Sequence, residues 1–485
     1  MADQTSNLTI RNLTITPLAL VQIEHLNSSH PAPSTTPQSD NIKELSGVVL
    51  DPFTETQPPI PAPNPDRGKR IRLTFEDSTT KHRYSCELPP SSGQRSVVLQ
   101  PHHQSDSEKK QQDSNDAGQG EETSKQFTSI YLPHHRYLTL LSTANLSTWM
   151  ASLNSSLPLS ALSIPGTHNS PTCYLALPSV RCQAVPVQEQ LLNGVRFLDV
   201  RVSCPPYNPS PDANHDDDPT FLTTLSLHLV HSAFPVSLIG RKHLSDLFST
   251  LYSFLAAHPS ETILLSLKRE GTGKGTDHDL ARIIHRHSCP KKHTSETSKW
   301  YTSPRIPTLG EVRGKIVLVR RYGIDTAFVP ADEAGIDGSA WPDNVADGTC
   351  GSGTIRIQDY YGVMSKGQIQ TKIRFAQEGL ERAAAQRVHP SSSSQRKVAP
   401  LYINFLSASN FFNASCWPDR IAVKINPSMI EYLCMNHGAP EKGPGKLEVG
   451  DAATGIVVTD WVGHRGDWDL IRCIVAWNAK LQLRR

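Results

Sequence analysis

The sequence predicts a mixed α/β chain, built as a distorted TIM-type (β/α)8 barrel that follows a small N-terminal antiparallel β-sandwich module. Three observations support this fold class. The 485 residues leave room for a barrel of about 250 to 350 residues and an extra module. From residue 146 onward, short apolar runs alternate with segments of helical spacing, which is typical of a parallel sheet. Before residue 146, short β-rich segments are separated by polar turns.

The first predicted domain is the β-rich module, residues 1–145. Residues 8–26 are rich in β-branched side chains and partly alternating, so they predict one or two strands. Further short segments share this character: residues 46–50, 71–75, 84–88, 97–99, 127–132 and 137–141. Residues 27–43 are Ser/Pro-rich and residues 101–125 have almost no apolar content, so we expect both loops to be disordered. We expect the module to serve packing or interaction rather than a second active site.

The second predicted domain, residues 146–485, begins its sheet with the apolar run 157–164. This predicted strand stops at a Pro-Gly turn, so His168 lies on a loop just past the end of a strand. Loops held by a rigid scaffold are where catalytic residues concentrate. The next predicted strand, residues 194–201, alternates in a way that puts Asp199 and Arg201 on one face.

The later strands of this domain also end in polar residues. Residues 225–231 form a strand that ends at His231, and residues 243–255 have the apolar spacing of a covering helix. Four further strands are predicted at residues 314–322, 354–361, 400–407 and 455–460, with a helix at 366–384. In a barrel the carboxyl ends of the strands converge on one face. The sequence therefore predicts one catalytic face that gathers His168, Arg201, His231, Lys268, Arg321, Asp359 and Asp460.

Composition narrows the class of protein further. The formal net charge is +2, which implies no strongly charged partner, and we find no nucleic-acid-binding motif. No run of about 18 apolar residues exists, so no transmembrane segment is predicted. The N-terminus lacks the features of a signal peptide, so we expect a cytoplasmic or peripheral membrane location. The nine cysteines show no metal-ligand spacing and are interpreted as scattered thiols.

Four stretches carry a family resemblance. They are SIPGTHNS at 163–170, GVRFLDVR at 194–201, LVHS at 229–232 and ETILLSLKRE at 261–270. In this order they resemble the catalytic X region of phosphatidylinositol-specific phospholipase C, in its metal-independent bacterial form and its fungal relatives. The resemblance covers roughly residues 148–485. It implies a barrel that cleaves an inositol phospholipid, held at a membrane surface, to diacylglycerol and cyclic inositol phosphate.

The resemblance also implies roles for individual residues. His168 would be the general base and His231 the general acid, since imidazoles suit both tasks near neutral pH. Arg201 would stabilise charge on the phosphate, and Asp460 would orient His168. Asp199 is expected to lie behind the catalytic residues and to hold them in position without contacting the substrate. The positions expected to hold the inositol ring are Lys268, Arg321, Asp359 and Tyr361, with Arg320 as the alternative to Arg321, because adjacent strand residues face opposite sides.

Asn169 departs from the bacterial pattern, which has Asp after the first histidine. We expect Asn169 to contact His231 without adding charge, so the pKa of His231 should fall and the leaving-group step should slow. The same position is an Asn in the calcium-dependent eukaryotic enzymes, where it binds the metal. Those enzymes carry an acid where this chain has Arg201, and a cation there would repel Ca²⁺. We therefore expect catalysis without a metal or other cofactor, with Ca²⁺ as the alternative.

Other functions remain open at this point. The same barrel could act on a glycosylated inositol lipid or on another phosphodiester, such as a glycerophosphodiester. A third class is a non-catalytic protein that binds lipid headgroups, which Asn169 makes conceivable. The presence of both His168 and His231 favours an enzyme over a binding protein.

Overall fold

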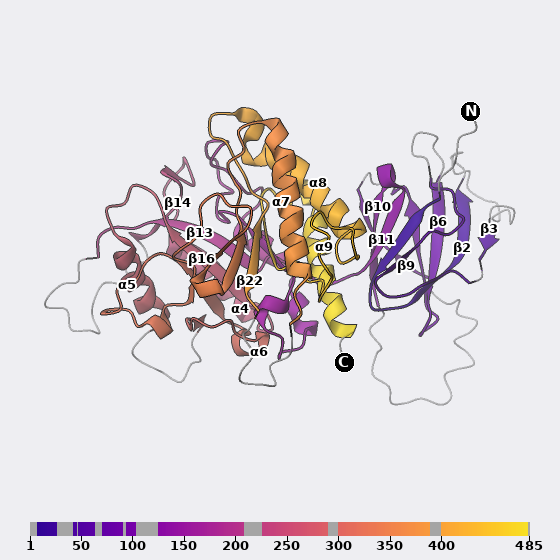
Figure 1. The fold of residues 1–485 in the computed structure, drawn as a ribbon, viewed down its shortest axis with the longest axis horizontal. Helices are drawn as coiled ribbons and strands as arrows, with labels where there is room; N and C mark the ends of the chain where they lie inside the picture. Colours follow the sequence, from indigo (N-terminus) through magenta and orange to yellow (C-terminus); the bar gives the residue numbers. More distant parts are fainter. Residues whose placement is uncertain are drawn as a thin grey trace. The chain divides into compact units, whose positions relative to one another are not determined.

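The computed structural model describes residues 7–26, 42–45, 47–63, 70–90, 94–102, 125–207, 226–289, 299–388 and 399–483. The chain divides into two compact units, which are described separately (Figure 1). The first comprises Met1–Ala144 together with Ala479–Arg485, and the second comprises Asn145–Asn478. The last residues of the chain thus group with the N-terminal unit, whereas we expected them in the barrel. Most of the predicted loops 27–43 and 101–125 lie outside the described residues.

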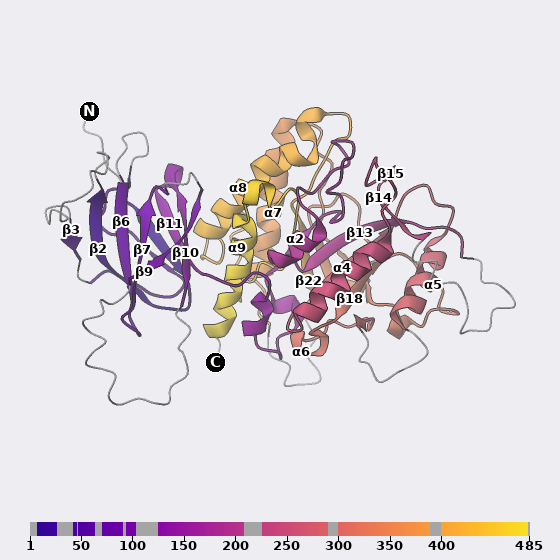
Figure 2. The ribbon, with the colours of Figure 1, turned by 180° about the vertical axis from the view of Figure 1, so that it is seen from behind.

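The N-terminal unit contains two β-sheets (Figures 1 and 2). The five-stranded sheet has the order β5 (Thr54–Thr56), β1 (Thr9–Leu13), β11 (Tyr137–Ser142), β10 (Phe127–Leu132) and β8 (Ser96–Val98). The six-stranded sheet has the order β3 (Ile42–Glu44), β2 (Leu18–Leu26), β6 (Arg70–Asp77), β7 (Arg83–Leu88) and β9 (Gln100–Pro101), with β4 (Val49–Leu50) paired to β2. Buried side chains of both sheets, such as Ile10, Leu138 and Phe75, form one hydrophobic cluster.

The expectation of a purely antiparallel module is wrong in one place. Strands β1 and β11 pair in parallel, with Thr9 opposite Tyr137 and Leu13 opposite Leu141. A parallel pair needs a long connection rather than a hairpin, and here β2 to β10 intervene between the two strands. The pairing was not predictable from local turn signals because it joins segments far apart in the sequence.

The second unit is built on a curled, mainly parallel sheet that gives it a mixed α/β character. The order along the sheet is β17 (Trp300–Tyr301), β18 (Ile316–Arg321), β16 (Ile263–Arg269), β13 (Phe197–Ser203), β12 (Ile164–Thr167), β23 (Ile456–Thr459), β22 (Leu401–Phe405), β21 (Ile355–Gln358) and β20 (Gly348–Cys350). Three strands lie off this path: β14 (His228–His231), β15 (Phe234–Pro235) and β19 (Ile336–Asp337). The strands from β18 to β21 all run parallel, so their carboxyl ends meet at one edge.

A closed eight-stranded ladder is not formed in the described part of this unit. No pairing between β18 and β21 is found among the described residues, and the partners of β18 other than β16, the parallel strands β17 and β19, are each only two residues long. The segment that connects β18 to β21 contains only the short strands β19 and β20 and single 3-10 turns, η6 (Ala331–Glu333) and η7 (Gly351–Gly353). The regular alternation of strand and helix therefore breaks here, and the sheet stays open at this point.

Helices cover the sheet (Figures 1 and 2). They are α2 (Val187–Leu192), α4 (Leu244–Ala257), α5 (Asp277–Ser288), α6 (Leu309–Val312), α7 (Lys366–Ala384), α8 (Pro418–Met435) and α9 (Asp469–Ala476). The helices predicted at 243–255 and 366–384 correspond to α4 and α7. Helix α4 buries Leu244, Leu247, Phe248, Leu251, Phe254 and Leu255. None of these helices, nor any other in the described residues, has the length and apolar character to cross a bilayer.

The first predicted strand of this unit is placed too early in the sequence. Residues 157–164 contain a short buried 3-10 turn, η5 (Leu159–Ala161), and strand β12 begins only at Ile164. A short buried apolar run has no periodicity that separates a strand from a buried turn. The correction leaves His168 where it was expected, one residue past the carboxyl end of β12.

Candidate active site

His168 is held by a buried carboxylate. Strands β12 and β23 pair in parallel with Thr167 opposite Thr459, so the next residue on each strand, His168 and Asp460, are neighbours. The ring Nδ1 of His168 lies 3.1 Å from Oδ1 of Asp460, a distance at which the ring N–H donates to the carboxylate. Burial raises the pKa of the Asp460 carboxyl, and the contact with His168 opposes that rise.

Gln183 reinforces this pair and was not predicted. Its Nε2 donates to the carbonyl oxygens of His168 at 2.6 Å and Thr459 at 3.0 Å, and it lies 3.3 Å from Oδ1 of Asp460. Gln183 is fully buried. It lies in the long loop between β12 and α2, and no local pattern in that loop marks it as a partner of Asp460, which is far away in the sequence.

His231 is the second histidine of the site. Its ring is edge-on to that of His168, with centroids 5.7 Å apart and an interplanar angle of 86°. Its Nδ1 lies 2.7 Å from the carbonyl oxygen of Val180, to which the ring N–H donates. Burial, together with the nearby Arg201 charge and the His168 ring, lowers the pKa of His231 to about 3. The imidazole is therefore neutral in the substrate-free protein.

Asp199 joins two guanidinium groups. Its Oδ2 lies 3.2 Å from Arg201 Nη2, and its Oδ1 lies 3.2 Å from Arg321 Nη1. Burial favours a raised pKa for the Asp199 carboxyl, but the two arginines outweigh burial and hold the pKa well below its usual range. Burial acts first on Arg201 and lowers its pKa, yet the carboxylates of Asp199 and Glu270 raise it above the ordinary value.

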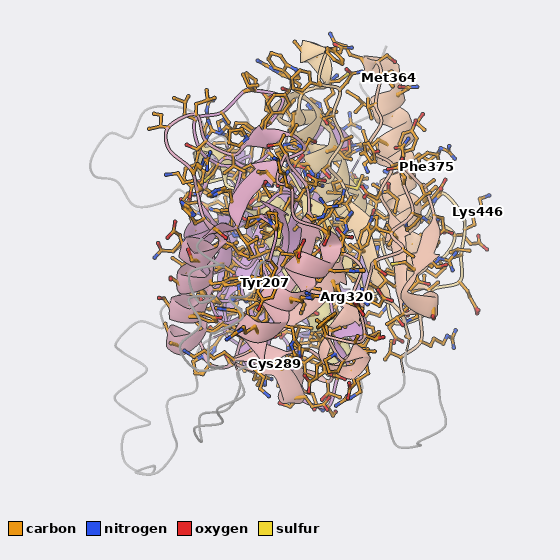
Figure 3. All side chains as sticks on the ribbon, turned by 90° about the vertical axis from the view of Figure 1, so that its left-hand side faces the viewer. Tyr207, Cys289, Arg320, Met364, Phe375 and Lys446 are labelled. Carbon is orange, nitrogen blue, oxygen red and sulfur yellow. The ribbon has the colours of Figure 1, made fainter. Side chains whose placement is uncertain are left out.

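The choice between the adjacent arginines is resolved by their contacts. Arg321 bonds Asp199 and lies over the ring of Trp341, with 3.8 Å from its guanidinium carbon to the ring centroid. Arg320 instead pairs with Asp337 at 2.8 Å, and it is labelled in Figure 3. Arg321 is thus the arginine that faces the predicted site.

Glu270 is a member of the cluster that sequence reasoning missed. Its carboxylate lies 3.2 Å from Arg201 Nη1, and it accepts from Lys268 Nζ at 2.7 Å and from the backbone N–H of Ser232 at 2.9 Å. Burial favours a raised pKa, but Arg201 and Lys268 outweigh it and lower the pKa of Glu270 to about 2. A signal was present: residues two apart on a strand share a face, and Glu270 follows Lys268 by two.

The remaining predicted ring-binding residues are arranged differently. The carboxylate of Asp359 accepts from Trp341 Nε1 at 3.0 Å, so Trp341 links Asp359 to Arg321. The Tyr361 hydroxyl donates to Asp343 Oδ1 at 2.7 Å, and this hydrogen bond, with partial burial and the Asp343 charge, raises the pKa of Tyr361 to about 12. Tyr361 is 40% exposed and lies outside the hydrogen-bonded cluster.

Asn169 is fully buried and has a φ of 43°, in the left-handed region that Asn tolerates better than most residues. Its backbone N–H lies 3.3 Å from Oδ2 of Asp199. Within the described residues neither its amide oxygen nor its amide nitrogen has a hydrogen-bond partner. The expected contact with His231 is not among the hydrogen bonds of the described residues, and the carbonyl of Val180 takes that role.

Exposed apolar side chains gather on loops that follow these strand ends. They are Leu175, Leu177, Phe234, Leu238, Ile239, Met364, Phe411 and Phe412, and we call this set the apolar rim. The ring of Phe234 stacks on Phe411 at 5.4 Å, and Phe411 contacts Phe412 at 5.2 Å. The backbone N–H of Leu238 donates to the carbonyl of Leu175 at 2.9 Å. Contacts between loops therefore join several members of the rim.

The donor set does not suit Ca²⁺, which takes six to eight oxygen ligands. Both carboxylate oxygens of Asp199, the acid beside Asn169, are engaged by guanidinium groups. Two groups of side chains in the described residues could hold a softer metal ion. His168, Cys182 and His231 offer nitrogen and sulfur, and His285, Cys289 and Glu333 offer nitrogen, sulfur and a carboxylate oxygen.

Comparison with known proteins finds similarity between part of this chain and a described family. Residues 155–322 match the family described as "Phosphatidylinositol-specific phospholipase C, X domain". The 1-phosphatidylinositol phosphodiesterase of Listeria monocytogenes is 30% identical over 178 residues, which cover 35% of this chain and 47% of the relative. The match thus spans about half of that protein's length. The 1-phosphatidylinositol phosphodiesterase of Staphylococcus aureus (strain Newman) is 26% identical over 323 residues, covering 65% of this chain and 88% of the relative.

Solved structures agree on the fold. A crystal structure of phosphatidylinositol-specific phospholipase C from Staphylococcus aureus, with pentafluoro-Phe incorporated, superposes with a TM-score of 0.51 at 23% identity, covering 69% of this chain and 97% of that one. A structure of the same enzyme from a study of its membrane binding gives a TM-score of 0.50 at 23% identity, with 69% of this chain and 97% of that one covered. Residues 155–322 of this chain are therefore similar to the phosphatidylinositol-specific phospholipase C X-domain family, and the second unit shares the fold of the Staphylococcus aureus enzyme.

Proposed function

We propose that this protein is a phosphatidylinositol phosphodiesterase that produces diacylglycerol and a cyclic inositol phosphate. One observation carries the proposal: the rings of His168 and His231 lie in edge contact. His168 is bonded to Asp460, and the nearby Arg201 charge helps to lower the pKa of His231. The names of the relatives, 1-phosphatidylinositol phosphodiesterase, support the choice of substrate.

His168 acts as the general base on the inositol 2-hydroxyl. Its Nδ1–H is committed to Asp460, so its Nε2 carries the lone pair that accepts the hydroxyl proton. The imidazolium that forms is stabilised by the buried carboxylate, which also keeps the ring in the productive tautomer. The freed alkoxide then attacks the phosphorus of the same headgroup.

Arg201 and Arg321 stabilise the charge that develops on the phosphate. Each guanidinium uses part of its donor set on Asp199, while the Nε–H of each is buried without a partner in the described residues. Unpaired buried donors are costly, and phosphate oxygens would satisfy them. Preorganised donors of this kind contribute about 3 to 4 kcal/mol each to transition-state stabilisation.

His231 acts as the general acid. Its Nδ1–H donates to the Val180 carbonyl, which leaves Nε2 to carry the proton for the departing diacylglycerol oxygen. The low pKa of the substrate-free imidazole means that this proton must arrive with the substrate. A phosphodiester brings one negative charge into the site, which favours the imidazolium. Binding and protonation of the acid are therefore coupled.

The inositol ring is held by Lys268, Asp359 and Tyr361 in this proposal, and the buried amide of Asn169 is available to a substrate oxygen. The apolar rim, with Phe412 94% exposed, supports peripheral docking on a lipid surface, where the substrate resides. We infer in addition that the curled sheet is a distorted, incompletely closed (β/α)8 barrel within Asn145–Asn478, and that the N-terminal unit is a β-sandwich used for packing or interaction.

The test is turnover of phosphatidylinositol vesicles in the presence of EGTA. We expect activity to persist in chelator and to be lost in His168→Asn, because the chemistry runs on side chains of the protein. Complete loss in EGTA with recovery on adding Ca²⁺ would contradict metal-independent catalysis. Glycosylated inositol lipid and a glycerophosphodiester are assayed in parallel, since faster turnover of either would replace phosphatidylinositol as the substrate. Headgroup binding without turnover of any of them would identify a binding protein.

A further inference from the structure

A thiol lies beside the proposed general acid, and the chemistry described above does not use it. Cys182 is fully buried. Its Sγ lies 3.7 Å from Nδ1 of His231 and 3.4 Å from the carbonyl oxygen of Val180. It is adjacent in sequence to Gln183, which bonds the other histidine through its carbonyl. In the sequence of this loop between β12 and α2, Cys182 therefore lies between Val180, which accepts from His231, and Gln183, which donates to the carbonyl of His168.

The three side chains His168, Cys182 and His231 offer a ligand set that suits a soft cation. His168, Cys182 and His231 each offer one ligand atom, and these atoms lie within 4.8 Å of one another. Zn²⁺ prefers such nitrogen and sulfur donors in tetrahedral geometry, with Zn–S about 2.3 Å and Zn–N about 2.1 Å. Those lengths require a sulfur–nitrogen separation of about 3.6 Å, and the Cys182–His231 separation is 3.7 Å.

We propose that His168, Cys182 and His231 form a binding site for a thiophilic divalent cation, for which Zn²⁺ is the probe, and that its occupancy inhibits the protein. The cation takes one lone pair from each imidazole and displaces the thiol proton to solvent, so that the thiolate becomes the third ligand. A carboxylate behind a ligating histidine is the usual support of zinc sites, and Asp460 occupies that place behind His168.

Two features weaken the site. The hydrogen bond from His231 to the Val180 carbonyl, at 2.7 Å, must break if Nδ1 is the ligand. The Arg201 charge, which already depresses protonation of His231, also opposes a dication. Both features lower the affinity for the cation, so we expect a chelator to remove it. Inhibition rests on the proposed function, because the cation occupies the base and the acid together, whereas coordination itself does not depend on that function.

The coordination test uses the full chain titrated with Co²⁺, whose bond to a thiolate gives a charge-transfer absorption band. The matched control is Cys289, which belongs to the other group of potential ligands, with His285 and Glu333. In Figure 3 Cys289 lies toward the bottom of the view and Met364, a rim residue, toward the top. We expect the band to disappear in Cys182→Ser and to remain in Cys289→Ser. The reverse pattern, or no band in the wild-type chain, would overturn the proposal.

A second variant protects the test against misfolding of Cys182→Ser. His231→Gln retains an amide that can donate to Val180, and the optical titration does not require it to be active. We expect its Co²⁺ affinity to fall about 10-fold or more, and an unchanged affinity would contradict His231 as a ligand.

The inhibition arm measures phosphatidylinositol turnover in Zn²⁺-buffered solution, with each variant normalised to its own rate without Zn²⁺. We expect Zn²⁺ to inhibit the wild type and Cys289→Ser alike, and the inhibitory concentration to rise about 10-fold or more in Cys182→Ser. Ca²⁺ and Mg²⁺ at the same concentrations should not inhibit. Equal inhibition of all three proteins would refute the role of Cys182. If the chain turns over no phosphodiester, the proposed function fails, and the Co²⁺ titration still decides whether the site exists.

Discussion

Replacing Asp460 by Asn should slow the reaction while preserving the geometry of His168. The buried Oδ1 of Asp460 accepts from His168 and lies within reach of the Gln183 amide. In Asp460→Asn, the amide oxygen can take the place of Oδ1, because both neighbours present N–H groups to that point. The tautomer of His168 is thereby kept, and what is lost is the negative charge behind the ring.

The size of the effect follows from that distinction. A carboxylate next to a cation favours the charged form by about 1 to 3 pKa units, and each unit corresponds to about 1.4 kcal/mol, or tenfold in rate. We therefore expect kcat/KM to fall between about 10-fold and 1000-fold.

The assay is kcat/KM on a soluble short-chain substrate from about pH 5 to 9, with Asp347→Asn as the control. Asp347 precedes β20 and pairs with Arg356 of β21, and no hydrogen bond or ion pair found for it in the described part of the chain involves a site residue. A loss below about 3-fold would refute an electrostatic role for Asp460. A loss of about 10000-fold, as expected when the tautomer is wrong, would show that Gln183 does not orient residue 460.

Three further perturbations test other parts of the structure. The pKa of His231 in the folded protein, about 3, lies below its value in the unfolded chain, about 6.5. Between these two pH values the unfolded state binds more protons, so the stability of the fold decreases as the pH drops from about 6.5 to about 3. His231→Gln should flatten this slope when urea midpoints are compared at pH 7.5 and 5, and an equal slope would contradict the burial of a neutral ring. Phe412→Ser should weaken vesicle binding without changing hydrolysis of the soluble substrate, and unchanged sedimentation with vesicles would remove the rim from the docking surface. Glu261→Leu should destabilise the fold by about 3 to 5 kcal/mol in urea unfolding, since it strands the fully buried Arg196 that Glu261 pairs with at 2.9 Å, and a loss below about 1 kcal/mol would contradict a charged Arg196 in the core.

The parts of the fold that were predictable are those in which apolar residues recur at a regular spacing or form a continuous run. Helix α4 follows from apolar residues spaced along one face, and β13 and β16 follow from their apolar runs. The stretch between β18 and β21 carries no such period, and the opening of the sheet there depends on pairing that does not form. The parallel pairing of β1 with β11 is likewise a contact between distant segments that no local residue pattern specifies.

The same division holds in the candidate site. Asp199 and Arg201 were predictable as partners because they share one face of β13, and their side chains meet at 3.2 Å. Glu270 carried the same signal relative to Lys268 and was overlooked. Gln183, Val180 and Trp341 come from long loops, and their roles arise only when those loops close over the strand ends. Sequence spacing cannot supply such contacts.

His168 and His231 are hydrogen-bonded to groups of different charge, and this difference affects how a catalytic cycle ends. His168 rests on a carboxylate and His231 on a neutral carbonyl. In the proposed chemistry, formation of the cyclic ester leaves His168 protonated and His231 neutral. This is the inverse of the protonation states at the start of the cycle. Attack of water on the cyclic ester would use His231 as base and His168 as acid, and would restore the starting arrangement. If the cyclic product leaves first, the protein must exchange protons with bulk water before its next turnover. The ratio of cyclic to opened product therefore reports whether the cycle ends by that exchange or by attack of water on the bound cyclic ester.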